Sequence, residues 1–231
     1  MRPFEILFIV SLGWGLWTLF SKPHKRNNIV SIIGLSIFLC LAHLVIEKPH
    51  WQMIPAYFLL LLIALHKAKP VVFAMRLGLI FILIVSATLP TAIPIIKLPN
   101  PTGPNIIGSS AHHWIDQSRM EWFTDEDPGD LREIMVQFWY PGLTKNNMNR
   151  IPYIDHLNLR AKTISSAGNF PSLLVKHIDL TQTNSYDKLI PNSKKAPFPV
   201  IIISHGITGM RHLHTSLAEN LASHGLSLIH I

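Results

Sequence analysis

The sequence predicts a two-part chain, with about four membrane-spanning helices at the N-terminus and part of an α/β domain after them. The first part is indicated by four apolar runs within residues 1–96, a mean hydropathy of +0.31 and only 14% charged residues. The second is indicated by alternating strand patterns and by one strand, turn and helix near residue 200. We assign residues 1–96 to a membrane anchor, 97–110 to a linker and 111–231 to the α/β part.

The four predicted spans are residues 4–20, 29–46, 51–66 and 77–93. About 20 apolar residues cross ~30 Å of hydrocarbon, so the third segment is short, and three spans or a re-entrant third segment is the alternative. Trp14 and Trp17 near one end of the first span favour a bilayer interface. A cleaved signal peptide is the alternative for the first span. Pro90 and Pro94 are expected to end the fourth.

Basic residues in the loops predict the orientation. The first and third loops hold six of them (Lys22, Lys25, Arg26, Lys67, Lys69 and Arg76), and the opposite side holds Arg2, Lys48 and Lys97. The positive-inside rule then places those two loops in the cytoplasm and everything after Ile96 outside it, as expected in a bacterial cytoplasmic membrane. The net charge of +7 belongs to these loops, so no nucleic-acid partner is expected, and the lone Cys40 forms no disulfide within the chain.

Beyond the Pro- and Gly-rich linker, two strands are expected at residues 114–123 and 133–140. Ile134, Val136, Phe138 and Tyr140 fall on one face of the second. The acidic stretch between them is predicted to be a hairpin turn, with a calcium site as the weaker alternative for Asp125, Glu126, Asp127 and Asp130. Residues 143–197 are loop-rich, with a helix expected at 171–178.

The stretch from residue 198 to 224 organises the α/β part. A buried strand is predicted at residues 200–204, followed by a glycine-rich turn and an amphipathic helix, which together make half of a βαβ unit. We expect Leu213, Leu217 and Leu221, with Ala218, to pack on the sheet, and Glu219 and Asn220 to face outward. A glycine turn at the carboxyl end of a strand is a backbone anion site, and so a candidate oxyanion hole. A zinc site at His205, His212 and His214 is the weaker alternative, and no metal is predicted.

A family resemblance follows from an ordered set of motifs. S-H-G-I-T-G-M-R (204–211) with L-A-S-H-G resembles the H-G-x-G-x-x-R region of α/β-hydrolases similar to platelet-activating factor acetylhydrolase. Four upstream motifs resemble that family in the same order: P-T-G-P (101–104), H-W-I-D-Q-S-R-M-E-W-F-T (113–124), D-P-G-D-L-R-E (127–133) and V-Q-F-W-Y-P (136–141). The resemblance implies a serine ester hydrolase without a cofactor, acting on a phospholipid or small ester.

The resemblance also assigns roles within the turn. The backbone N–H of Ile207, between the two glycines, would belong to the oxyanion hole, with His205, Gly206 and Gly209 as the supporting turn. Such hydrolases place the nucleophile in G-x-S-x-G, later in the chain than this turn. No two of the twelve glycines are four residues apart, and Ser204 precedes the turn. We therefore expect the 231 residues to be an inactive fragment, with the nucleophile, acid and base beyond residue 231.

Two further interpretations stay open. Residues 226–231 depart from the family pattern, so they form either a divergent strand or a non-native tail. A non-catalytic membrane sensor or scaffold with an extracytoplasmic ligand-binding domain is the alternative function. A transporter is disfavoured, because Glu5 and Arg76 are the only charges expected near the spans and both lie close to their ends.

Overall fold

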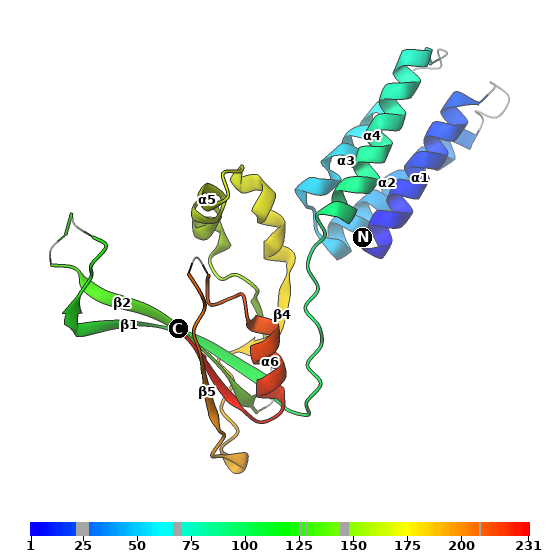
Figure 1. The fold of residues 1–231 in the computed structure, drawn as a ribbon. Coiled ribbons are helices and arrows are strands. Elements are labelled where there is room, and N and C mark those ends of the chain that lie inside the picture. The colour runs from blue at the N-terminus through cyan, green and yellow to red at the C-terminus, as the bar shows by residue number, and fades with distance from the viewer. Residues whose placement is uncertain (22–27, 67–70, 125, 128, 144–147, 208) are drawn as a thin grey trace. The chain divides into compact units, whose positions relative to one another are not determined.

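The computed structural model describes residues 1–21, 28–66, 71–124, 126–127, 129–143, 148–207 and 209–231. It divides into two compact units, Met1–Ile96 with Asn158–Leu180, and Lys97–Leu157 with Thr181–Ile231. The first unit is helical and the second is built on a sheet (Figure 1). Lys22, Lys25, Arg26, Lys67 and Lys69, on which the predicted orientation depends, lie outside the described residues.

Four apolar helices run through the first unit: α1 (Pro3–Phe20), α2 (Ile29–Ala42), α3 (Ile54–Leu65) and α4 (Phe73–Ala92). A π-helical turn, η2 (His43–Glu47), extends α2, and a 3₁₀ turn, η3 (Trp51–Met53), precedes α3. Three segments are long and apolar enough to cross a membrane: α1, α2 with η2, and α4. The segment from Trp51 to Leu65 is shorter, so the predicted count of four spans is not confirmed.

The fourth helix differs from its predicted bounds at the start. It begins at Phe73, so Arg76 lies within the helix rather than in the preceding loop, where Nε donates to Val71 O at 3.1 Å. Pro90 lies inside the last turn, and the helix continues to Ala92. Pro90 lacks the N–H that would donate to Ser86 O, but the helix continues past it, and Ile93 N–H donates to Leu89 O at 2.9 Å.

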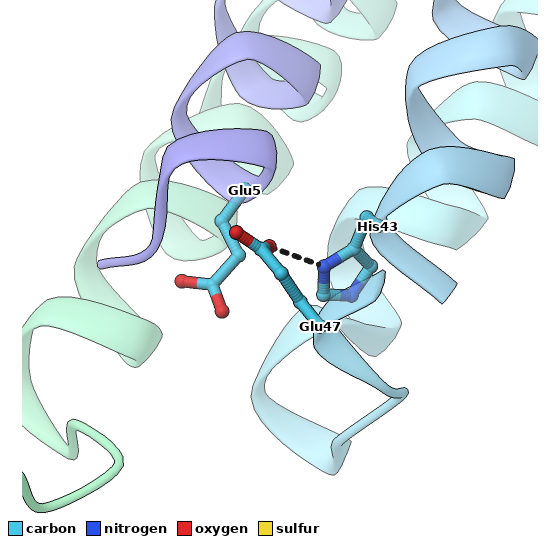
Figure 2. A group of neighbouring side chains, drawn as sticks. All are labelled: Glu5, His43 and Glu47. Carbon is cyan, nitrogen blue, oxygen red and sulfur yellow. Dashed lines mark hydrogen bonds and ion pairs between the residues drawn. The ribbon is translucent and has the colours of Figure 1, made fainter. Parts of the chain in front are cut away.

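Buried polar side chains gather at one end of the helices. Glu5 of α1 lies beside His43 and Glu47 of η2 (Figure 2), and His50 Nε2 lies 3.0 Å from Glu5 Oε1. The expectation that Glu5 and Arg76 were the only charges near the spans is therefore wrong. The π-helical turn carries the second helix as far as Glu47, which brings a second carboxylate into the bundle.

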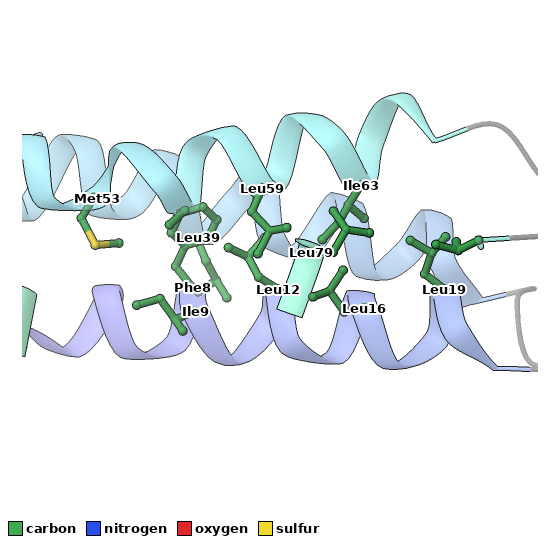
Figure 3. Close-up of a cluster of buried hydrophobic side chains, with 12 residues drawn as sticks. Phe8, Ile9, Leu12, Leu16, Leu19, Leu39, Met53, Leu59, Ile63 and Leu79 are labelled. Atoms are coloured by element: carbon green, nitrogen blue, oxygen red, sulfur yellow. The ribbon is translucent and has the colours of Figure 1, made fainter. Parts of the chain in front are cut away.

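The helices meet along an apolar seam. Phe8, Leu12 and Leu16, at the spacing that places side chains on one helical face, point from α1 toward Leu59 and Ile63 of α3 (Figure 3). The outer surface is also apolar, since many large side chains are exposed, including Trp14, Trp17, Val30, Phe38, Phe58 and Phe81. A bundle that is apolar on both its seam and its exterior is typical of membrane helices.

The chain contributes a later helical segment to the same unit. It consists of α5 (Leu157–Ala167) and η4 (Ser172–Leu180), and the ring of His177 lies 6.3 Å from that of Trp51. The helix expected at residues 171–178 is thus present, as a 3₁₀ helix.

A six-stranded mixed sheet forms the second unit, in the order β3-β4-β1-β2-β6-β5. The strands are β1 (Ile106–Met120), β2 (Leu131–Gly142), β3 (Arg150–Pro152), β4 (Gln182–Asp187), β5 (Val200–Ile203) and β6 (Ser227–His230). The predicted hairpin is confirmed, because β1 and β2 pair antiparallel along most of their length. β1 begins at Ile106, so the end of the expected linker is strand.

The expected βαβ unit is present, with a different buried face. Parallel strands β5 and β6 are joined by α6 (Thr215–Ser223). Helix α6 buries Ala218, Glu219 and Ala222, whereas Leu217 is 53% exposed. The prediction is therefore confirmed for Ala218 and for Leu221, which packs against the buried cluster, and is wrong for Leu213 and Leu217, which are exposed, and for Glu219, which is buried. Small side chains let the helix lie close to the sheet, and Glu219 finds hydrogen-bond partners there.

Strand β5 is also less buried than its sequence predicts. Among the described residues it lies at the edge of the sheet and pairs with β6 alone. Val200 and Ile202 are accordingly 59% and 66% exposed. An apolar edge strand of this kind is a template for further strand pairing.

Candidate active site

The predicted oxyanion turn follows the carboxyl end of β5. Ile203 pairs in register with His230 of β6, so both strands end beside the turn. Gly209 N–H donates to Gly206 O at 2.9 Å and closes the loop. Thr208, between these two glycines, lies outside the described residues.

Gly206 and Gly209 of the turn differ in the space available for a side chain. A methyl group on Gly209 would come within 2.8 Å of Gly206 O and 2.9 Å of His205 Cβ. A methyl group on Gly206 would meet nothing within 4 Å. Glycine is therefore required at position 209, because a side chain there would collide with the turn itself. Position 206 has room for a side chain.

Ile207 lies at the tip of the turn, with its side chain 97% exposed. A residue there can present its backbone N–H outward without burying its side chain, which an anion site needs. The spacing in this chain is H-G-x-x-G-x-R, one residue longer between the glycines than the family pattern. Ile207 therefore shares the interval between the glycines with Thr208.

Histidines surround the inner side of the turn. His205 Nδ1 lies 3.0 Å from Gly206 O, to which it can donate, and its ring centroid lies 5.6 Å from that of His230. His214 lies equally close to His230, at 5.6 Å. Burial, and then the neighbouring His205 and His214, lower the pKa of His230, so it is neutral near pH 7. Sequence reasoning missed His230, whose neighbours are set by strand pairing.

Arg211 anchors the chain after the turn. Its Nη2 donates to Asp155 Oδ1 at 2.5 Å and its Nε donates to Gln137 Oε1 at 3.1 Å. Gln137 in turn donates to Ser109 Oγ at 3.2 Å, which links the turn to β2 and β1. The arginine was part of the sequence motif, but Asp155, Gln137 and Ser109 were not identified, because nothing in their local sequence pairs them with Arg211.

The zinc alternative for the three histidines of this region is not supported by their positions. His212 Nε2 lies 2.8 Å from Asp155 Oδ1, whereas the rings of His205 and His214 lie beside that of His230, edge-on and tilted respectively. In the described part of the chain, the group whose donor atoms could hold a metal is Glu5, His43 and Glu47 instead.

The acidic hairpin turn carries local hydrogen bonds. Asp127 Oδ1 accepts from Gly129 N–H at 3.1 Å and Asp130 Oδ2 accepts from Thr124 Oγ1 at 3.0 Å. These are the short-range contacts of an ordinary turn. Asp125 of the calcium alternative lies outside the described residues.

A polar cavity of about 400 Å³ opens beside Arg211 and His212. Its lining includes Asp155, Arg150 and Lys188, so charged groups of both signs face it. Ile207 does not line it. The structure thus brings Arg211, His212 and Asp155 together at the cavity and leaves the tip of the turn on an open surface.

Comparison with known proteins adds family information. The family model for platelet-activating factor acetylhydrolase, isoform II, matches residues 95–230, which is more than half of the 231 residues. A solved ferulic acid esterase from Streptomyces cinnamoneus is 25% identical, with a TM-score of 0.45 over 59% of this chain. The match covers 36% of the esterase, so the chain spans about a third of its length. No curated protein matches the chain.

Proposed function

The chain belongs to the family of platelet-activating factor acetylhydrolase, isoform II, and on that premise we propose that the protein is a membrane-anchored carboxylic ester hydrolase. The observation that carries the proposal is the family match, which includes the whole β5–turn–α6 unit. Within that unit the turn is closed by the Gly209–Gly206 hydrogen bond and leaves Ile207 at its tip.

In the proposed reaction a serine attacks the acyl carbonyl of the ester while a histidine takes its proton. The Ile207 N–H and a second backbone N–H hold the developing oxyanion. The ester C–O bond then breaks, and the alcohol leaves with the proton that the histidine took. Water, deprotonated by the same histidine, attacks the acyl-serine, and the acid is released as the serine regains its hydrogen. The Arg211–Asp155 contact fixes the end of the turn and so positions its N–H groups. This chemistry needs no cofactor.

The proposed nucleophile is not among these 231 residues, since G-x-S-x-G does not occur in them. We therefore assign the activity to the whole protein and expect these residues alone to lack it. They would supply the anchor, the oxyanion turn and its supporting sheet.

We propose a phospholipid with a short acyl chain as the substrate, because the family name specifies an acetylated phospholipid and a membrane anchor would hold the site near it. The apolar exterior of the bundle supports the anchoring. Arg2 and Lys48 meet at one end of the helices, where Arg2 Nη2 donates to Lys48 O at 3.2 Å. Their side has fewer basic residues, which favours an extracytoplasmic location for that end and for the hydrolase part.

The test begins with the coding DNA across the codon of Gly225. We expect the frame to continue into a strand, a G-x-S-x-G and later an acid and a histidine. The protein encoded by that frame should hydrolyse a 2-acetyl phospholipid in detergent, and replacing the motif serine by alanine should abolish hydrolysis. The matched control is an alanine at Ser204, which precedes the turn and should leave activity largely intact.

A stop codon directly after Ile231 would instead favour the sensor or scaffold alternative. An in-frame continuation whose product cleaves no ester would also contradict the proposal. Cleavage of small esters without cleavage of phospholipids would retain the hydrolase and reject the lipid substrate.

A further inference from the structure

The buried polar cluster at the end of the helices is unrelated to the hydrolase turn and has the donor atoms of a metal site. Glu5, His43 and Glu47 each direct one ligand atom to the same place, and these three atoms lie within 4.8 Å of one another (Figure 2). They come from the start of α1 and from η2, about 40 residues later in the chain. A π-helical turn such as η2 is uncommon and often marks a functional position.

The charges of the cluster are not balanced by its arginine. The side chains of Glu5, His43 and Glu47 are 2%, 0% and 7% exposed. Arg2 donates to Glu5 through Nε at 2.5 Å and through its backbone N–H at 2.8 Å, and turns its remaining nitrogens toward Glu47 O and Lys48 O. The guanidinium therefore pairs with the Glu5 carboxylate, whereas the Glu47 carboxylate accepts from Phe4 N–H at 3.0 Å and lies 3.0 Å from His43 Nδ1. A second positive charge is needed, because unpaired buried charges are costly.

The hydrogen bonds of the Gln52 amide indicate where a positive charge is required. Gln52 Nε2 donates to Ile93 O at 3.0 Å, which fixes the orientation of the amide and leaves Oε1 as an acceptor only. His50 Nδ1 lies 2.9 Å from this oxygen, so Nδ1 must carry a hydrogen. In a neutral His50 the lone pair of Nε2 then points at Glu5 Oε1, 3.0 Å away. Two acceptors at this distance need either a shared hydrogen or a cation beside them.

His43 is held in a comparable way. Its Nε2 lies 2.8 Å from Tyr57 Oη, which accepts from Nε2–H when Nδ1 binds a metal and donates to Nε2 when Nδ1 carries the hydrogen. Its Nδ1 lies 3.0 Å from Glu47 Oε2. An outer oxygen that accepts from one ring nitrogen and leaves the other free is the usual support for a metal-binding histidine.

We propose that Glu5, His43 and Glu47 bind a divalent transition-metal ion of the Zn²⁺ class, with His50 as the adjoining fourth donor, and that the ion clamps the start of α1 to the end of the second helix. Mixed imidazole and carboxylate donors suit such ions. Ligands bound at ~2.0–2.1 Å lie roughly 3–4 Å apart around the metal, so small side-chain shifts bring the donors into place. A single divalent cation would bind all four side chains, whereas a proton on His50 would stabilise only the contact of His50 with Glu5.

The experiment measures metal binding by the full chain in detergent, purified without a polyhistidine tag and freed of metal with EDTA. Co²⁺ is the optical probe, through its d–d absorption, and Zn²⁺ is the competitor. We expect one Co²⁺ per chain, displaced by Zn²⁺, and a higher melting temperature when the metal is bound. Glu47→Gln and His43→Asn should each abolish the absorption band or weaken binding strongly.

The matched control is His113→Asn. His113 and Glu133 form an exposed histidine–glutamate pair at 2.7 Å in the other unit, and its loss should leave Co²⁺ binding unchanged. Tyr57→Phe keeps all the proposed ligands, so it tests the site even if the ligand variants fail to fold, with an expected loss of about 10- to 100-fold in affinity. The proposal is overturned if the wild-type chain binds Co²⁺ no more tightly than Glu47→Gln, or if His113→Asn weakens binding as much as His43→Asn.

Discussion

Arg211 donates from Nη2 to Asp155 Oδ1 at 2.5 Å, which joins the end of the oxyanion turn to a loop 56 residues earlier in the chain. Arg211 is buried, and Gln137 accepts its Nε hydrogen. The turn itself has few packing contacts at its tip, where Ile207 is exposed. Its position relative to the sheet therefore depends on this anchor.

Replacing Arg211 by methionine should destabilise the sheet unit by about 3 kcal/mol, because Gln137 and the partly exposed Asp155 both lose a charged hydrogen-bond donor. Hydrogen exchange of the β5, β6 and α6 amides in the full chain measures the loss. Arg119→Met is the control, since Arg119 pairs with Asp116 at 2.6 Å on the exposed hairpin. That change should leave the exchange of these amides unchanged, because exposed ion pairs contribute little to stability. Equal effects of the two variants would show that Arg211 is not an anchor.

Replacing Glu219 by alanine should cost about 3 kcal/mol. The Glu219 carboxylate accepts from Asn184 N–H at 2.6 Å and from Ser185 Oγ at 2.7 Å, and both donors would lose their acceptor. Leu217→Ala on the exposed face of α6 should cost less than ~1 kcal/mol. Thermal unfolding of the full chain compares them. A larger loss of stability for Leu217→Ala than for Glu219→Ala would show that Leu217 packs on the sheet, as the periodicity predicts.

Alanine substitutions at Gly206 and Gly209 should have different effects on the order of the turn. Gly209→Ala places a methyl group against the carbonyl oxygen of Gly206 and Cβ of His205, and should disorder the turn, whereas Gly206→Ala should leave the fold unchanged. The readout is amide exchange of residues 203–214, with the exchange of β1 as an internal reference. Faster exchange in Gly206→Ala than in Gly209→Ala would contradict the turn geometry.

Acid should destabilise the sheet through His230. Its folded pKa lies below the ordinary value of 6.5, so below pH 6.5 the unfolded chain binds more protons than the folded one. Stability contributed by neutral His230 is complete above pH 6.5 and declines as the pH falls from there. Melting temperatures of wild type and His230→Gln between about pH 7.5 and 5 measure this. The variant should lose less stability on acidification, and parallel curves would exclude His230 as the cause.

The sequence determined the features that depend on neighbouring residues. Apolar runs predicted the helices between residues 3 and 92, and alternation of apolar and polar residues predicted the β1–β2 hairpin. The apolar and glycine-rich segment near residue 200 predicted the strand, turn and helix. In each case the hydrophobic period or a turn residue acts over a few positions along the chain. The short third helix and the start of β1 at Ile106 were less accurately placed, because such ends are set by packing and strand pairing.

Tertiary structure alone decided which distant residues meet. A helical wheel places Glu219 on the outward face of α6, but Asn184 and Ser185 of β4 donate hydrogen bonds to its carboxylate. Asp155 meets Arg211, and Glu5 meets His43 and Glu47, across intervals with no local pattern. A periodic pattern reports which face of an element is apolar, whereas a buried charge is stable only where another part of the fold supplies its partner. Those partners are fixed by the packing of complete elements.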